Sequence, residues 1–231
     1  MHLITKRLVA RVAVYVLGLL ILAFGVVFAI NSNLGISPVN SLPFAASLVT
    51  GVGMGISVTI FFLANLVLQI VILRRDFKLI NLTQIIYSFI FGYFVDFAMF
   101  VLGDFTLPTY FGQLTMLAIS LILLPTGLSM YLEAKLVPMP SEGFVLAVTQ
   151  KLQKYTFARI KVIYDCALVL SAITLTLVAL GGVYGAREGT VISALLIGKL
   201  MPPARKAIAH VLGKLGFYPP PEPPPEKAAA A

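Results

Sequence analysis

Residues 12–50 read VAVYVLGLLILAFGVVFAINSNLGISPVNSLPFAASLVT, and this stretch decides the fold. It begins with an uncharged apolar run at 12–30, which matches the ~20 residues that a helix needs to cross a bilayer. An irregular segment follows, and then a shorter apolar run starts at Pro38. A full span followed by a short helix is a pattern of membrane proteins, so the sequence predicts an all-α membrane protein.

Five further apolar runs are long enough to cross a bilayer, or nearly so. With the first, they lie at residues 12–30, 56–73, 79–102, 114–132, 160–182 and 190–201, the last being short. They predict about six spans in a single transmembrane domain over residues 1–217. Residues 204–217 are expected to form a basic amphipathic helix on the lipid surface, or else a plain solvated helix end. The Pro- and Ala-rich residues 218–231 are expected to be disordered.

The composition excludes a soluble domain, because 59% of the residues are hydrophobic and only 11% are charged. Soluble domains carry about 25% charged residues. The net charge is +8, but the basic residues lie in short clusters between apolar runs. The expected partner of this charge is therefore the anionic surface of the lipid bilayer and not a nucleic acid.

The basic clusters alternate between successive connections. The connections at 31–55 and 103–113 hold no Lys or Arg, and the one between the last two runs holds only Arg187. Basic residues mark cytoplasmic segments, so both termini are predicted to lie in the cytoplasm. The clusters are Lys6, Arg7 and Arg11; Arg74, Arg75 and Lys78; Lys135, Lys151, Lys154, Arg159 and Lys161; and Arg205, Lys206 and Lys214.

Two connections, 31–55 and 135–156, open with an irregular Pro-containing stretch and then become apolar for about ten residues. Pro38 and Pro140 suit the first turn of a helix, where a missing N–H costs nothing. Ser37 is placed to cap the first of these helices. The sequence thus predicts a half-helix after the first span and another after the fourth.

The two halves of the chain match each other weakly. The proposed repeats cover about residues 8–105 and 110–202, and each would contain a span, a half-helix and two more spans. Because three spans per half is an odd number, the second half would enter from the opposite side, as in the inverted repeats of transporters. The paired residues are Gly25 and Gly127, Leu34 and Leu136, Pro38 and Pro140, Ala45 and Ala147, Asn65 and Asp165, Gln84 and Thr190, Ile86 and Ile192, and Gly92 and Gly198.

The candidate binding residues lie at the half-helix starts and inside two spans. A helix N-terminus carries partial positive charge, so two starts that meet near the midplane would form a polar site that favours anions. The alternative is that these residues are ordinary turn residues. The candidates are Ser37, Pro38, Asn40, Ser41, Asn65, Pro140, Ser141, Glu142 and Asp165.

Two acidic residues are candidates for coupling to a proton or ion gradient. An ionised Asp165 inside a span would cost ~2.5–3.5 kcal/mol at the centre, so it is expected to face a polar cavity or a partner. The alternative is a hydrated ion pair with Lys161, one turn earlier. Glu142 either serves coupling or is explained by the helix dipole alone.

Four segments resemble the YczE/YyaS/YitT family of bacterial membrane proteins, and the resemblance covers about residues 10–202. They are LAFGVVFAINSNLGISPVNSLPFAAS (22–47), GLSMYLEAKLVPMPSEGF (127–144), the Tyr164-Asp165 pair and GAREGTVISALLIGK (185–199). The YitT branch has a soluble C-terminal domain that is not seen here, so the sequence looks closer to YczE. The resemblance implies a multi-pass protein of the bacterial plasma membrane and supplies no substrate.

The sequence predicts a non-enzyme. It contains no recognisable catalytic or phosphate-binding motif, and the single Cys and two distant His residues form no metal-ligand spacing, so no cofactor or metal is expected. The leading hypothesis is a transporter or permease for an unknown small solute, and a homo-oligomer is compatible with it. The alternative is a non-transporting membrane scaffold or regulatory factor for a partner protein.

Overall fold

The computed structural model describes residues 2–103, 105–214 and 217, with side chains from residue 8 onward. These residues form eight α-helices and two short 3-10 helices, and no strand. The predicted disordered tail, 218–231, lies outside the described residues. The helices are α1 (His2–Asn31), α2 (Pro38–Thr50), α3 (Met54–Leu73), α4 (Gln84–Leu102), α5 (Tyr110–Glu133), α6 (Pro140–Leu152), α7 (Phe157–Leu180) and α8 (Glu188–Lys214), with 3-10 turns at Arg74–Asp76 and Leu79–Thr83.

Five of the helical segments are long and apolar enough to cross a membrane. They are Leu8–Asn31, Met54–Asp76, Leu79–Leu102, Tyr110–Glu133 and Phe157–Leu180. They correspond to the first five predicted spans. The sixth predicted span lies in α8, which is not among the five because Lys199, Arg205 and Lys206 interrupt its apolar residues. The predicted amphipathic helix is not separate either: it continues the same helix, through Lys214.

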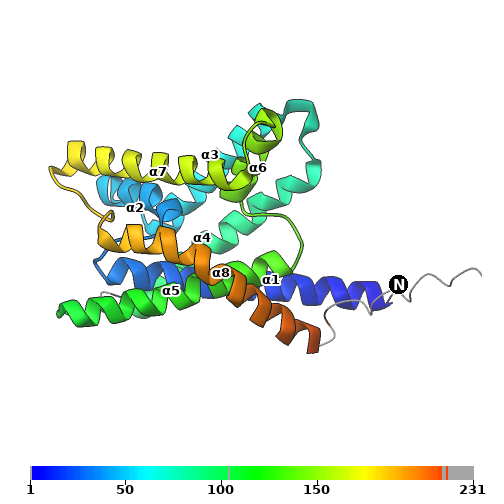
Figure 1. Cartoon of the computed structure of the whole chain (residues 1–231), viewed down its shortest axis with the longest axis horizontal. Coiled ribbons are helices and arrows are strands. Elements are labelled where there is room, and N and C mark those ends of the chain that lie inside the picture. Colours follow the sequence, from blue (N-terminus) through cyan, green and yellow to red (C-terminus); the bar gives the residue numbers. More distant parts are fainter. Residues whose placement is uncertain (1, 104, 215–216, 218–231) are drawn as a thin grey trace, which may run out of the picture.

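The bundle is built around α1 and α5, which lie side by side along its long axis (Figure 1). Two glycines make their contact close: a Cβ added at Gly18 would lie 2.9 Å from the carbonyl oxygen of Gly127, and one at Gly127 would lie 2.6 Å from that of Gly18. Small residues let membrane helices approach to backbone contact and gain packing energy along their length. The α1–α5 pair is therefore held in backbone contact that larger side chains would disrupt.

The other helices pack around this pair in a regular order. Helix α4 lies on α1 and α8 lies on α5, whereas α2 packs on α7 and α6 packs on α3. Further contacts join α3 to α4, α2 to α3 and α6 to α7. In Figure 1, α7 lies at the edge of the bundle opposite to α5. The buried core between α1, α3, α4 and α5 is formed by apolar and aromatic side chains, including Leu19, Val58, Phe62, Phe91 and Leu124.

The two predicted half-helices are present as α2 and α6. Each has 13 residues and begins with the expected proline, Pro38 or Pro140. The capping prediction for Ser37 is wrong in its detail, although Ser37 does occupy the N-cap position. Its hydroxyl accepts a hydrogen bond from the Asn40 side chain (2.8 Å) and makes no bond to a backbone N–H of the described helix.

Basic side chains gather at the end of the bundle where α1 begins, which we call the N-terminal end. There Arg11 donates to the carbonyl oxygens of Ala134 (2.7 Å) and Lys135, and Arg205 pairs with Glu133 (2.5 Å). Helix α8 starts at the opposite end, where the N–H of its Gly189 donates to the carbonyl of Leu34 (2.7 Å). It therefore extends along the whole bundle, and it ends on the same side as the start of α1 (Figure 1).

This arrangement leads to a topology prediction. Fusions of green fluorescent protein and alkaline phosphatase report cytoplasmic and periplasmic ends, respectively. We expect fluorescence and no phosphatase activity for fusions after Phe217, and the reverse for fusions after Leu107, because only the N-terminal end is rich in Lys and Arg. Active phosphatase after Phe217 would contradict the predicted orientation.

Candidate functional site

The start of α6 lies inside the bundle, among polar side chains from four other helices. Pro140 and Ser141 are buried, and Glu142 is partly exposed. The Ser141 hydroxyl donates to the Glu142 carboxylate at 2.9 Å. The carboxylate also interacts electrostatically with the hydroxyls of Tyr15 on α1, Tyr131 on α5 and Tyr164 on α7. We call these residues, Tyr15, Tyr131, Ser141, Glu142 and Tyr164, the Glu142 site.

Two of the three tyrosine hydroxyls already use their protons in hydrogen bonds. Tyr15 donates to the backbone carbonyl of Val137 at 3.2 Å, and a carbonyl can only accept. Tyr164 donates to the Asn65 side-chain oxygen at 2.7 Å. The amide of Asn65 cannot be turned around, because its nitrogen donates to the carbonyl of Phe61 (2.8 Å). The oxygens of Tyr15 and Tyr164 therefore offer only lone pairs to their surroundings.

The third hydroxyl is buried without a regular partner. Tyr131 is 1% exposed, and its hydroxyl forms no hydrogen bond of normal geometry with a described residue, although it lies near enough to Glu142 to interact with the carboxylate. Glu142 itself has no cationic partner among the residues that the structure describes. A half-buried carboxylate in a membrane bundle normally has one, because the ionised form is costly there.

A pair of glutamines holds the start of α6 in place. The Gln69 side-chain nitrogen on α3 donates to the Pro140 carbonyl and to the Gln84 side-chain oxygen on α4, each at 3.0 Å. Both glutamines are almost fully buried. Gly143 leaves room for this contact, since a Cβ there would lie 2.5 Å from the Gln69 oxygen. The amides thus link α3, α4 and α6 directly beneath the Glu142 site.

The start of α2 forms a second, separate polar group. Ser37, Asn40 and Ser41 are buried, and the N–H of the preceding Ile36 donates to the carbonyl of Gly185, between α7 and α8. The start of α6 lies beside Tyr15, whereas the segment before α2 is tied to the connection between α7 and α8. No hydrogen bond among the described residues joins the start of α2 to the start of α6. The single midplane centre expected from the sequence stays a prediction.

Asp165 lies next to the Glu142 site but has its own partner. Its carboxylate pairs with Lys161 at 2.5 Å, one helical turn earlier on α7, and both side chains are 24% exposed. This is the ion pair that was the alternative to a cavity-facing role. Asn65, the residue matched to Asp165 in the other half, reaches Tyr164 and not Asp165.

Comparisons with known proteins place the chain in a family. A model of a family of unknown function, DUF6198, matches residues 9–205. The chain belongs to the DUF6198 family. It is 28% identical over 177 residues to the uncharacterized protein YyaS of Bacillus subtilis, covering 73% of this chain and 87% of YyaS. It is 27% identical over 202 residues to the uncharacterized membrane protein YczE of the same bacterium, covering 85% and 86%. No solved structure matches the chain.

These relationships confirm the resemblance to YczE and YyaS and agree with a multi-pass membrane protein that has bacterial homologues. In this DUF6198 member, sequence reasoning missed the roles of Tyr15, Tyr131 and Gln69. Tyrosines near the ends of spans are ordinary interfacial residues, so nothing marked these two. Gln69 did have a signal, because it lies four residues after Asn65 and so shares a helix face with it.

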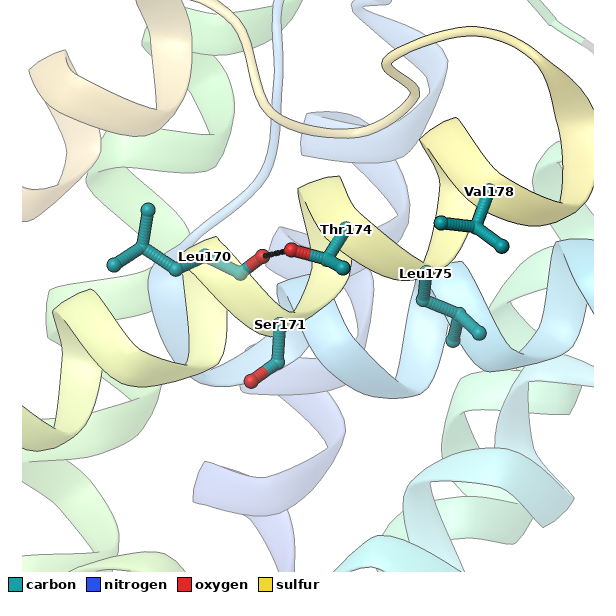
Figure 2. A pocket seen from close by; sticks show the side chains of 5 residues that line it. All are labelled: Leu170, Ser171, Thr174, Leu175 and Val178. Atoms are coloured by element: carbon teal, nitrogen blue, oxygen red, sulfur yellow. Dashed lines mark hydrogen bonds between the residues drawn. The ribbon is translucent and has the colours of Figure 1, made fainter.

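One further feature of this DUF6198 member is a shallow hollow on the outer surface of α7. Figure 2 shows that it is lined by Leu170, Ser171, Thr174, Leu175 and Val178. The Thr174 hydroxyl donates to the carbonyl of Leu170 (2.9 Å), so it is already satisfied. The hollow offers mainly apolar contacts. No cluster of three metal-ligating side chains occurs among the described residues.

Proposed function

We propose that the chain is a small-solute transporter and that the Glu142 site holds the solute. The observation that carries this proposal is the position of Glu142. It is a partly exposed carboxylate, without a cationic partner among the described residues, at the start of an interrupted membrane segment. Interrupted segments and unpaired acidic groups within a membrane bundle are features of solute and ion pathways.

The packing of the helices supports the inverted repeat that this proposal includes. Exchanging the halves turns α1, α2, α3 and α4 into α5, α6, α7 and α8. Under this exchange the α2–α7 contact becomes α6–α3, α1–α4 becomes α5–α8, and α2–α3 becomes α6–α7. All three counterparts are present, which is the pattern expected of two related halves.

The largest departure from this symmetry lies between α3 and α4. Helices α3 and α4 pack closely, and a Cβ on Gly92 of α4 would lie 2.6 Å from the carbonyl oxygen of Gly55 on α3. The matched helices α7 and α8 have no comparable packing, and a Cβ on the matched Gly198 would meet nothing within 4 Å. A transporter whose two halves hold different conformations is open to one side only, so this difference supports the proposal.

Reconstitution tests the proposal. We expect full-length protein in proteoliposomes to move at least one solute from a panel of cationic, neutral and anionic compounds, measured as solute-induced current or uptake. Glu142→Ala is expected to lower the rate about tenfold or more, because it removes the site's charge. Glu188→Ala is the matched control, since this carboxylate pairs with Arg187 at the opposite end of the bundle. Folded protein that moves no solute in the panel would contradict the proposal.

A second candidate function, a membrane scaffold for a partner protein, is favoured by the surface of α7. Several of its large apolar side chains are strongly exposed, including Val178 at 82% and Leu170 at 64%. Such a face can pack against another transmembrane helix as well as against lipid. Co-purification of a stoichiometric partner in mild detergent, lost when Leu170 and Val178 are replaced by serine, would support the scaffold.

A further inference from the structure

The Glu142 site contains more hydrogen-bond acceptors than donors. The carboxylate accepts a hydrogen bond from Ser141, and it lies near enough to Tyr15 and Tyr164 to interact with their hydroxyls, whose protons are hydrogen-bonded to Val137 and Asn65. Hydroxyl oxygens that have no proton left to donate repel a nearby carboxylate. The arrangement becomes favourable when a group with several N–H or O–H donors lies between them.

We propose that the Glu142 site binds the cationic N–H-donating head of an ammonium compound, either the ammonium ion or a small primary amine. An ammonium group has three or four N–H donors, and it would donate to Glu142 and to the hydroxyl oxygens of Tyr15, Tyr131 and Tyr164. This inference rests on the proposed transport function, whose solute class it names.

Two alternatives fit the site less well. An anion would be repelled by the Glu142 carboxylate and by the hydroxyl oxygens of Tyr15 and Tyr164. The helix dipole at the start of α6 would not offset this repulsion, because Glu142 already occupies that position. A divalent metal prefers six or more oxygen ligands, usually with several carboxylates, and the site offers one. An ammonium head gains a charge-assisted hydrogen bond and also uses the buried Tyr131 hydroxyl, which has no regular partner among the described residues.

Three probes distinguish the ammonium ion from a primary amine, and N–H donation from positive charge alone. Ammonium chloride, ethylammonium chloride and tetramethylammonium chloride carry the same charge, but the last has no N–H group. The chain has nine tyrosines and no tryptophan, so an ultraviolet difference spectrum reports tyrosine environments directly. Full-length protein in lipid nanodiscs is titrated with each probe, and its thermal unfolding midpoint is measured in parallel.

We expect saturable difference spectra and a raised unfolding midpoint with ethylammonium, ammonium or both. The probe that binds more tightly shows whether the site prefers a primary amine or the ammonium ion. Tetramethylammonium should bind about tenfold more weakly, or not at all, because it has no N–H group to donate a hydrogen bond. Glu142→Gln should weaken binding of the preferred probe about tenfold or more, whereas Glu188→Gln should leave it unchanged. Should Glu142→Gln not fold, Tyr131→Phe is expected to weaken binding about threefold.

Equal responses to ethylammonium and tetramethylammonium, or unchanged binding in both Glu142→Gln and Tyr131→Phe, would overturn the inference, as would folded wild-type protein that binds neither ammonium nor ethylammonium. The transport proposal fails separately. Specific ammonium binding without movement of any solute would retain the inference and reject transport. Movement of a neutral or anionic solute without ammonium binding would retain the transport proposal and reject the inference.

Discussion

Replacing Gly18 by leucine is expected to prevent the bundle from assembling. A Cβ at this position would lie 2.9 Å from the backbone oxygen of Gly127 and the backbone nitrogen of Tyr131, neither of which can rotate away. Helices α1 and α5 would have to separate along their whole contact. We expect a loss of about 3 kcal/mol, the upper end for overpacked interiors, and little folded protein in the membrane.

The control for this variant is Gly198→Leu. A Cβ at Gly198 meets nothing within 4 Å, and the residue lies on an exposed face of α8. Leucine also favours a helix over glycine by ~0.8 kcal/mol, so this variant should be as stable as the parent or slightly more so. Fluorescence-detected size-exclusion chromatography of both variants measures the difference. Equal monodisperse yields would show that α1 and α5 are not in backbone contact.

Replacing Gln69 by leucine is expected to produce the second large effect. The change removes the donor to the Pro140 carbonyl and to Gln84, and it leaves both groups buried without their partner. An unsatisfied buried polar group costs about 1–3 kcal/mol, so the thermal unfolding midpoint in detergent should fall clearly. The start of α6 should loosen as well, because among the described residues the Gln69 amide is the side chain of α3 that is hydrogen-bonded to Pro140.

A double-mutant cycle separates this effect from simple loss of packing. Gln84→Leu alone also leaves Gln69 partly unpaired, whereas the double variant replaces both amides with apolar groups of similar size. We therefore expect the double variant to be less destabilised than the sum of the two single variants. Strictly additive effects would show that the amide pair contributes no interaction energy.

Much of the fold could be predicted because it depends on local sequence. The lengths of the apolar runs identified the first five long helices, and Pro38 and Pro140 marked the first residues of α2 and α6. The sixth run was harder to interpret. Lys199 and the basic residues after Met201 suggested a boundary between a span and a surface helix, but backbone hydrogen bonding continues through them to Lys214 in one helix.

The site could be predicted only in part, because it depends on which helices meet. Glu142, Ser141 and Asn65 were expected, and they lie in or beside the Glu142 site. Their tyrosine neighbours come from positions more than a hundred residues apart on α1 and α5, and no local pattern connects them. The meeting of the two half-helix starts was inferred from weak symmetry, which relates positions in the two halves without giving the distance between them, so it stays a prediction.

The close contact of Gly18 with Gly127 also constrains how the protein is made. The ribosome adds 5–20 residues per second, so α1 waits about 5–20 seconds in the lipid before the glycine that completes its contact has been synthesised. During that interval the small-residue surface around Gly18 is open to any other transmembrane helix. Correct biogenesis therefore depends on an insertion machinery or lipid environment that keeps α1 from pairing prematurely.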